Sequence, residues 1–437
     1  MRTRLGATAR RTFSSLKVPN YRLYFAGQSV SVIGTWMQMT AQAWLVLTLT
    51  HSATDLGLLV ALQTLPVLLL GPYGGVVADR VDKRRMMVVL QSLMALQALA
   101  LGLLTVLGLV TFAEVCALAV VLGLNNAFEF SSRQAFVREM VGRDHVRNAV
   151  TLNSVMANLA RAVGPAVAGV LIATIGDGVC FLVNAGSFVA VVTSLLMMDP
   201  AALQPATPAP RAKGQLREGL AYARRTPEIA VPLLMMGLVG MLAYEFQVTL
   251  PVLAERTFHA GSEAYGLMSA CMGIGAVLGG LATAAKGRTG LRPIVLSAVG
   301  FGTAILATAL APALALAYAA LLLVGWASVS FISIANSTIQ LSAAPGMRGR
   351  TLSLWQVAFQ GTTPIGGPLI GWVIAASDPR VGLVVGAAAA LLAAAGGAFL
   401  ARHRHRLERP PATEQLDEVV KVVDALDAPA TPGTAPA

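Results

Sequence analysis

Long apolar runs separated by short polar segments recur along almost the whole chain. A run of about 18 or more apolar residues is long enough to cross a hydrocarbon core of roughly 30 Å as a helix. Membrane-spanning strands would instead appear as alternating segments of about ten residues, which the sequence does not show. The pattern therefore predicts an all-α integral membrane protein.

We expect twelve transmembrane helices in two pseudo-symmetric six-helix halves, residues 22–198 and 229–401. The first six lie near 22–48, 55–77, 86–108, 112–132, 149–174 and 178–198. The second six lie near 229–252, 263–285, 293–311, 313–336, 351–375 and 380–401.

Three segments lie outside these halves: an arm at 1–21, a linker at 199–228 and a tail at 402–437. In the linker, Leu216 and Leu220 recur at helical spacing among arginines, which predicts an amphipathic helix on the membrane surface. The tail is rich in Pro, Ala, Thr and acidic residues, a composition that is typical of disorder.

Composition agrees with membrane insertion. Hydrophobic residues make up 56% of the chain, only 12% of residues are charged, and the mean hydropathy is +0.68. A water-soluble chain carries about twice that charged fraction. The three cysteines lie far apart within apolar runs, which favours packing roles over a metal site or disulfides. We predict no metal and no cofactor.

The cationic residues predict the orientation. Of the 32 Lys and Arg residues, only Arg256 and Arg380 fall in loops on one side, and Arg161 falls inside a span. The positive-inside rule then places both termini in the cytoplasm and the chain in the cell (inner or plasma) membrane. Because the basic residues are spread over the inner loops, we expect them to meet anionic lipid and not nucleic acid.

The two halves share landmarks. Arg147 precedes Gly164-Pro165 by the same 17 residues that separate Arg350 from Gly367-Pro368. Together with the equal numbers of spans and the central linker, this repeat favours a transporter with its substrate cavity between two related halves. We expect it to act as a monomer.

A glycine, an acidic residue and a basic cluster follow the second span. Glycines here allow close helix approach, and the carboxylate can accept hydrogen bonds from a neighbouring helix N-terminus. The pattern resembles the loop between the second and third helices of the major facilitator superfamily, although Asp82 stands where that family usually has Gly. The resemblance implies a conformational latch, and it matches the family at Gly75, Asp79, Arg80, Lys83 and Arg84.

The fifth span carries a second motif. Arg161, Gly164, Pro165 and Gly169 resemble the Gly/Pro-rich motif of superfamily exporters, with Ala at two of its other glycine positions. Small residues permit close packing of the opposite half, and Pro165 interrupts the helical hydrogen bonding. An ordinary proline-kinked membrane helix would show the same features.

Glu129 and Arg133 lie four residues apart on one predicted helix face, so they can pair with each other. Glu129 could instead hold Lys83 or Arg84 in a cytoplasmic gate. With the motif of the fifth span, this stretch resembles the branch of the superfamily that contains the enterobactin exporter and related multidrug efflux proteins.

Two ionisable residues fall at membrane depth, where an unpaired charge costs about 2.5–3.5 kcal/mol or more. We therefore expect Glu245 and Arg161 to face the cavity, with Glu245 as the main candidate for proton coupling. The alternative is that Glu245 lies at the outer interface and is solvated. Polar residues that are candidates for the substrate cavity, or for hydrogen bonds between helices, are Gln38, Gln42, Asn153, Asn158, Tyr244, Gln356 and Gln360.

These features predict a secondary transporter, not an enzyme, that exports a small amphipathic molecule such as a drug, an antibiotic or a siderophore. We expect proton-coupled antiport by alternating access, with Na⁺ as the other candidate ion. The sequence has no GxxxxGK[ST] loop for an ATP-driven pump. A polytopic enzyme acting on lipid or a lipid-linked substrate remains an alternative, as do an importer and a non-transporting sensor with the same fold.

Overall fold

The computed structural model describes residues 13–204, 215–344 and 346–407. Within the helices, the side chains at 72, 75–76, 78–79, 143, 215–217 and 403–407 lie outside the described part. Residues 408–437 of the predicted disordered tail, the first twelve residues and residues 205–214 of the predicted linker also lie outside it.

The described residues form helices and connecting turns, with no strand. The first half contains η1 (Ser14–Lys17), α2 (Pro19–Thr50), α3 (Ala53–Arg80), α4 (Lys83–Val106), α5 (Phe112–Ile175) and α6 (Asp177–Leu196). The linker contributes η2 (Pro200–Ala202) and α7 (Gln215–Arg225). The second half contains α8 (Pro227–Leu242), α9 (Phe246–Val252), η3 (Leu253–Thr257), α10 (Ser262–Lys286), α11 (Leu291–Ala309), α12 (Leu314–Ser342), α13 (Arg348–Gln360), α14 (Thr363–Ala376) and α15 (Pro379–Leu407).

Ten helical stretches in the described residues are long and apolar enough to cross a membrane. The two remaining predicted spans are also helical. The first is α2, whose buried Gln28, Gln38 and Gln42 make it more polar. The eleventh is divided into α13 and α14, each too short to span alone. The predicted all-α fold with twelve membrane helices is confirmed.

The residues between the predicted fourth and fifth spans, 133–148, do not form a loop. The helix of the fourth span extends to Gly142 and the helix of the fifth span begins directly after it, so α5 consists of two helices joined at a kink. The chain reverses at Gly142, whose φ of 65° and ψ of −176° suit glycine because a Cβ would be strained there. The polar composition of this stretch indicated a loop, but helix continues into it from both sides of the kink, and residues within it such as Phe136 and Met140 are buried in the core of the first half.

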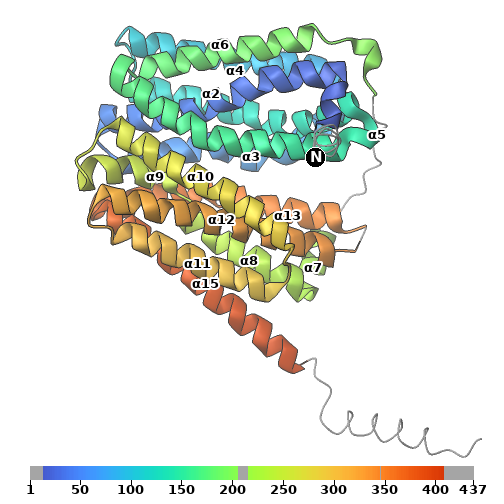
Figure 1. Ribbon diagram of the computed structural model, residues 1–437, viewed down its shortest axis with the longest axis vertical. Coiled ribbons are helices and arrows are strands. Elements are labelled where there is room, and N and C mark those ends of the chain that lie inside the picture. The colour runs from blue at the N-terminus through green and yellow to red at the C-terminus, as the bar shows by residue number, and fades with distance from the viewer. Residues whose placement is uncertain (1–12, 205–214, 345, 408–437) are drawn as a thin grey trace, which may run out of the picture.

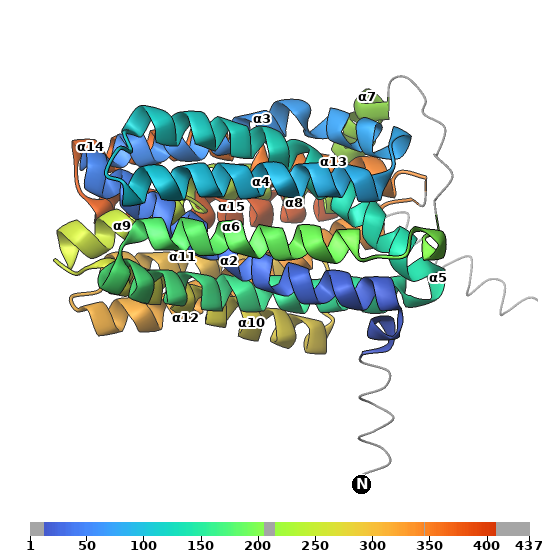
Figure 2. The same ribbon diagram turned by 90° about the horizontal axis from the view of Figure 1, so that it is seen from above.

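The two halves form two layers of nearly parallel helices. Figure 1 shows α2–α6 in one layer and α8–α15 in the other, and Figure 2 shows the same helices from above. The layers meet where α3 packs against α14 and α5 against α10. Helix α7 of the linker packs on α8 and α13.

We name the two ends of the bundle by their charge. The basic end carries the start of α4 (Lys83–Arg85) and the start of α13 (Arg348 and Arg350). The opposite end carries the turn between α2 and α3 and the turn between α14 and α15.

Candidate substrate cavity

Two helices of the second half are interrupted side by side. The seventh span breaks between α8 and α9 at residues 243–245, and the eleventh breaks between α13 and α14 at Gly361 and Thr362. The breaks touch each other, since a Cβ placed on Gly240 would lie 3.0 Å from the carbonyl oxygen of Ala358 and from Thr362 Oγ1. Tyr244 and Glu245 at the first break and Gly361 at the second line the space between the halves.

A cavity of about 1310 Å³ occupies that space. Both halves line it. Its wall includes the aromatic residues Trp36, Tyr73, Phe130, Tyr244, Phe246 and Phe359, the amides Gln63, Asn126, Gln247, Gln356 and Gln360, and the charged residues Glu129, Arg133, Arg161, Glu245 and Arg350. The cavity is open at the basic end, where the lining side chain of Tyr73 is 64% exposed.

Close contacts between the halves shut the opposite end. A Cβ on Gly57 of α3 would lie 2.7 Å from the carbonyl carbon of Gly367 in α14, so only glycine fits. On the other side of the bundle, a Cβ on Gly266 of α10 would lie 2.8 Å from the Cα of Gly169 in α5. The Arg256 guanidinium also donates a hydrogen bond of 2.5 Å to the carbonyl oxygen of His51 across the halves.

The motif of the fifth span contributes to this closure. Gly164 packs on α2, because its Cβ would lie 2.6 Å from Trp36 Cβ, and Gly169 packs on α10. Pro165 has no N–H to donate to the carbonyl of Arg161, four residues earlier. The same carbonyl lies where a Cβ on Gly273 would approach it to 2.8 Å, so α5 and α10 are nearly in backbone contact beside Arg161.

Three of the five charged lining residues are neutralised by ion pairs. Glu129 pairs with Arg133, with 3.1 Å between Arg133 Nε and Glu129 Oε1. Arg350 pairs with Glu218 of α7 at 2.6 Å. Glu129 is therefore in the local pair, and the described structure does not bring it to Lys83 or Arg84.

Glu245 lies in the break of the seventh span and is 4% exposed. Its carboxylate rests on α14, where a Cβ at Gly366 would lie 2.8 Å from Oε1 and one at Gly367 would lie 3.5 Å from Oε2. Oε1 has no hydrogen-bond partner, and no described cation lies within 4.0 Å of the carboxylate. The two glycines make room for a buried carboxyl group without neutralising it. Because Glu245 is buried, the alternative of a solvated residue at the outer interface does not apply in this structure.

Arg161 lies on the cavity wall within α5. Its guanidinium carbon is 5.0 Å from the centre of the Trp36 ring, which is a cation–π contact. The buried Nε atom has no hydrogen-bond partner, and no described carboxylate lies within 4.0 Å. Arg161 and Glu245 are thus on the same cavity but do not form a pair.

Three of the predicted latch residues, Arg80, Lys83 and Arg84, lie at the basic end and do not line the cavity. Lys83 Nζ is 2.7 Å from Glu139 Oε1, and both side chains are buried. Arg84 donates to the carbonyl oxygens of the last residues of α6. Arg80 is exposed at the end of α3. Beyond their helical backbone, Gly75 and Asp79 lie outside the described residues.

Of the predicted cavity residues, Tyr244, Gln356 and Gln360 line the cavity. Tyr244 is held by a hydrogen bond from its hydroxyl to the carbonyl oxygen of Ser328. Among the described lining residues, Trp36, Gln63 and Asn126 were not predicted, because the apolar pattern does not tell which face of α2, α3 or α5 turns to the cavity.

Four predicted cavity residues lie elsewhere in the structure, which corrects their assignment in this conformation. Gln38 donates to Gln97 at 3.0 Å and accepts from Asn184 at 2.7 Å, inside the first half. Gln42 is buried and accepts from Gln63 at 3.0 Å. These buried amides hydrogen-bond to one another inside the first half, and only Gln42 Nε2 among the polar side-chain atoms of Gln38 and Gln42 lacks a partner.

The other two lie on the second part of α5. Asn153 accepts from the hydroxyl of Tyr21 at 3.1 Å, and Asn158 donates to the carbonyl oxygen of Ser154 at 2.8 Å. Both bond within the first half, and neither lines the cavity.

Comparison with known proteins identifies the family to which this chain belongs. The model of the transmembrane secretion effector family matches residues 10–422. The chain belongs to this family of major facilitator superfamily transporters. Like its relatives it is a multi-pass membrane transporter, and the predicted superfamily membership is confirmed.

Three relatives show how far the similarity extends along the chain. The uncharacterised transporter YfiS of Bacillus subtilis is 31% identical over 49% of this chain and 50% of its own length. The staphyloferrin A transporter of Staphylococcus aureus is 25% identical over 59% of this chain and 65% of its own. The enterobactin exporter EntS of Escherichia coli is 25% identical over 83% of this chain and 86% of its own. The chain thus spans between half and two thirds of the first two relatives.

Solved structures support the fold. A bacterial homologue of the human lysosomal transporter Spinster, in an inward-facing and unoccupied conformation, superposes with a TM-score of 0.70 at 16% identity. It covers 90% of this chain, and the match includes 99% of the homologue. The nucleoside transporter NupG superposes with a TM-score of 0.71 at 13% identity, over 87% of this chain and 98% of NupG.

Proposed function

We propose that this transporter exports a small amphipathic molecule from the cytoplasm by alternating access, in exchange for protons. The observation that carries the proposal is the cavity of about 1310 Å³ between the halves, which mixes aromatic, amide and charged side chains. It is open at one end of the bundle and shut at the other by glycine contacts. A large cavity of mixed polarity suits a drug, an antibiotic or a siderophore, and two relatives are named for siderophores.

The charge distribution supports the direction. The open end is the basic end, which the positive-inside rule assigns to the cytoplasm with both termini. In that orientation the described conformation receives its substrate from the cytoplasm. The similarity of the fold to an inward-facing transporter agrees with this orientation.

Glu245 is our candidate for coupling. Broken membrane helices build ion and substrate sites in many transporters, and Glu245 lies in such a break. A charged carboxylate that is buried without a cation is unfavourable, whereas a proton would neutralise it. The proton would enter from outside in the other conformation and leave to the cytoplasm in this one. Arg161, unpaired in the same cavity, would respond to that change of charge.

The latch proposal concerns the other conformation. We expect Asp79 to join the two halves at the basic end when the cavity opens outward, as the resemblance of its loop implies. Asp79→Asn should then stall transport while the protein still reaches the membrane. Full transport by this variant would reject the latch.

The test is accumulation of a panel of amphipathic drugs and labelled siderophores in cells. Expression of the wild type should lower accumulation of at least one compound, and a protonophore or Glu245→Gln should restore it. Glu263→Gln removes a carboxylate that is exposed at the opposite end, so it is the matched control and should export normally.

Three results would contradict parts of the proposal. A wild type that raises accumulation would indicate uptake. Export that persists with a protonophore but requires Na⁺ would show that Na⁺, and not the proton, is the coupling ion. Unchanged export by Glu245→Gln would remove that residue from the coupling mechanism.

A further inference from the structure

Arg161 is a cation at membrane depth without a counter-ion. A charge there is costly unless it is paired or serves a ligand. Among the described residues, no carboxylate lies within 4.0 Å of it, and its contact is the face of the Trp36 ring. Its Nε atom is buried and has no hydrogen-bond partner. The protein therefore keeps a guanidinium on the cavity wall with hydrogen-bonding capacity that its own side chains do not use.

The remaining charges of the cavity do not compensate it. Glu129 and Arg350 are each neutralised by an ion pair. Glu245 rests on Gly366 and Gly367 of α14, in the second half, whereas Arg161 lies between α2 and α10. Among the described residues that line the cavity, Arg161 is thus the one cation without an ion pair, and an entering anion could bind it.

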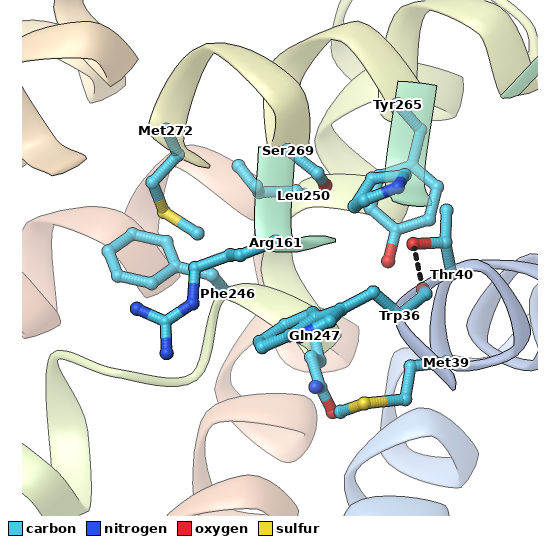
Figure 3. Close-up of a pocket in the computed structure, with 11 residues that line it drawn as sticks. Trp36, Met39, Thr40, Arg161, Phe246, Gln247, Leu250, Tyr265, Ser269 and Met272 are labelled. Carbon is cyan, nitrogen blue, oxygen red and sulfur yellow. Dashed lines mark hydrogen bonds between the residues drawn. The ribbon is translucent and has the colours of Figure 1, made fainter. Parts of the chain in front are cut away.

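Arg161 also borders a small apolar niche at the closed side of the cavity. The niche has a volume of about 40 Å³ and carries no acidic side chain. Figure 3 shows Phe246 and Met272 beside Arg161, and its guanidinium pointing away from Tyr265. An apolar body can therefore lie next to the cation, with Gln247 as the neighbouring polar group.

We propose that the substrate is an organic anion whose carboxylate binds Arg161 and whose aromatic or aliphatic body packs against Trp36 and Phe246. This inference rests on the proposed function and narrows its substrate class. The planar guanidinium can donate two parallel hydrogen bonds to a carboxylate. Trp36 contacts the guanidinium through its ring face, and Arg161 Nε has no hydrogen-bond partner. A lipophilic cation would be repelled at the same place.

The test is a binding measurement on the purified full chain in lipid nanodiscs, by isothermal titration calorimetry. The probes are naphthalene-2-carboxylate, the neutral naphthalene-2-carboxamide and the cationic 2-naphthylmethylamine, which share one ring system. The carboxylate should bind the wild type at least about tenfold more tightly than the carboxamide, as expected for hydrogen bonds to charged groups. Arg161→Gln should remove that preference, and Arg161→Lys should keep part of it.

Arg292→Gln is the matched control, since it removes an exposed cation at the start of α11 and should leave the preference unchanged. If Arg161→Gln is not recovered folded, Arg161→Lys is compared with the wild type. A weaker carboxylate preference in the lysine variant supports the site, because an ammonium group lacks the planar fork that donates two parallel hydrogen bonds, and an unchanged preference contradicts it. Equal binding of carboxylate and carboxamide, tighter binding of the amine, or a preference that survives Arg161→Gln would each overturn the proposal.

The experiments distinguish a failure of the proposed substrate class from a failure of the proposed export. If the carboxylate preference depends on Arg161 but cells export nothing, the site stands and the proposed export is wrong. If cells export compounds equally well with Arg161→Gln and the probes show no preference, export stands and the substrate class is wrong.

Discussion

Replacing Gly57 with alanine should open the closed end of the bundle. Gly57 lies where α3 meets α14, and a Cβ there would be 2.7 Å from the carbonyl carbon of Gly367 and 2.8 Å from the Cα of Pro368. Carbon atoms in contact are ordinarily about 3.5–4.0 Å apart, so the two helices must separate by about 1 Å. Both neighbours are backbone atoms and cannot rotate away.

The cost of such overpacking is about 1–3 kcal/mol. Only the conformation in which this seam is closed carries the cost, because the seam separates when the opposite end opens. The equilibrium between the two conformations should therefore shift by about 5- to 150-fold toward the one that is shut at the basic end.

Thiol labelling measures the shift. Ser353 lines the cavity near its basic end and is exposed in this conformation. In a variant without the three native cysteines, a cysteine at Ser353 should react several-fold more slowly with a polar maleimide when Gly57→Ala is present. Gly186→Ala is the control, since a Cβ on Gly186 meets no atom within 4 Å. Equal labelling rates in the two backgrounds would refute the reasoning.

Three further predictions concern stability and the linker. Glu139→Gln leaves Lys83 without its buried partner and should destabilise the protein by about 3–5 kcal/mol, measured as a lower Tm in detergent. Gly142→Ala forces a side chain onto a positive φ and should cost about 1–3 kcal/mol in the same assay. Arg350→Gln breaks the partly exposed pair with Glu218 and should leave Tm almost unchanged but accelerate proteolysis within α7 several-fold.

These measurements have internal controls. Glu263→Gln removes an exposed carboxylate and Gly186→Ala adds a methyl group in open space, so neither should lower Tm by a comparable amount. If Glu139→Gln melts like Glu263→Gln, the buried pair does not stabilise the basic end. If α7 is cleaved at the same rate with and without Arg350, the ion pair does not hold it.

The helices and their number were predictable from sequence because each span must satisfy its backbone hydrogen bonds inside the membrane. The site was predictable only in part. Glu245 and Arg161 stood out because charge at membrane depth demands a role. Gln38, on the same helix as the cavity residue Trp36, was misassigned because polarity alone does not separate a buried amide network from a cavity wall.

The breaks in the seventh and eleventh spans were also beyond the sequence pattern. Pro251 and Pro364 lie near them, but α5 continues through Pro165. Whether a proline interrupts a helix depends on which neighbour satisfies the freed carbonyl group. The closed seam depends likewise on pairs such as Gly57 and Gly367, which are far apart in the chain.

Alternating access is the central claim, and two inter-half distances measured by double electron–electron resonance in liposomes test it most directly. One spin-label pair joins Ser131 and Ser353 across the open basic end, and the other joins Thr174 and Glu263 across the closed end. The account predicts two populations in which the first distance shortens as the second lengthens, with Gly57→Ala enriching the second population. Distances that stay fixed, or that lengthen together, would contradict it.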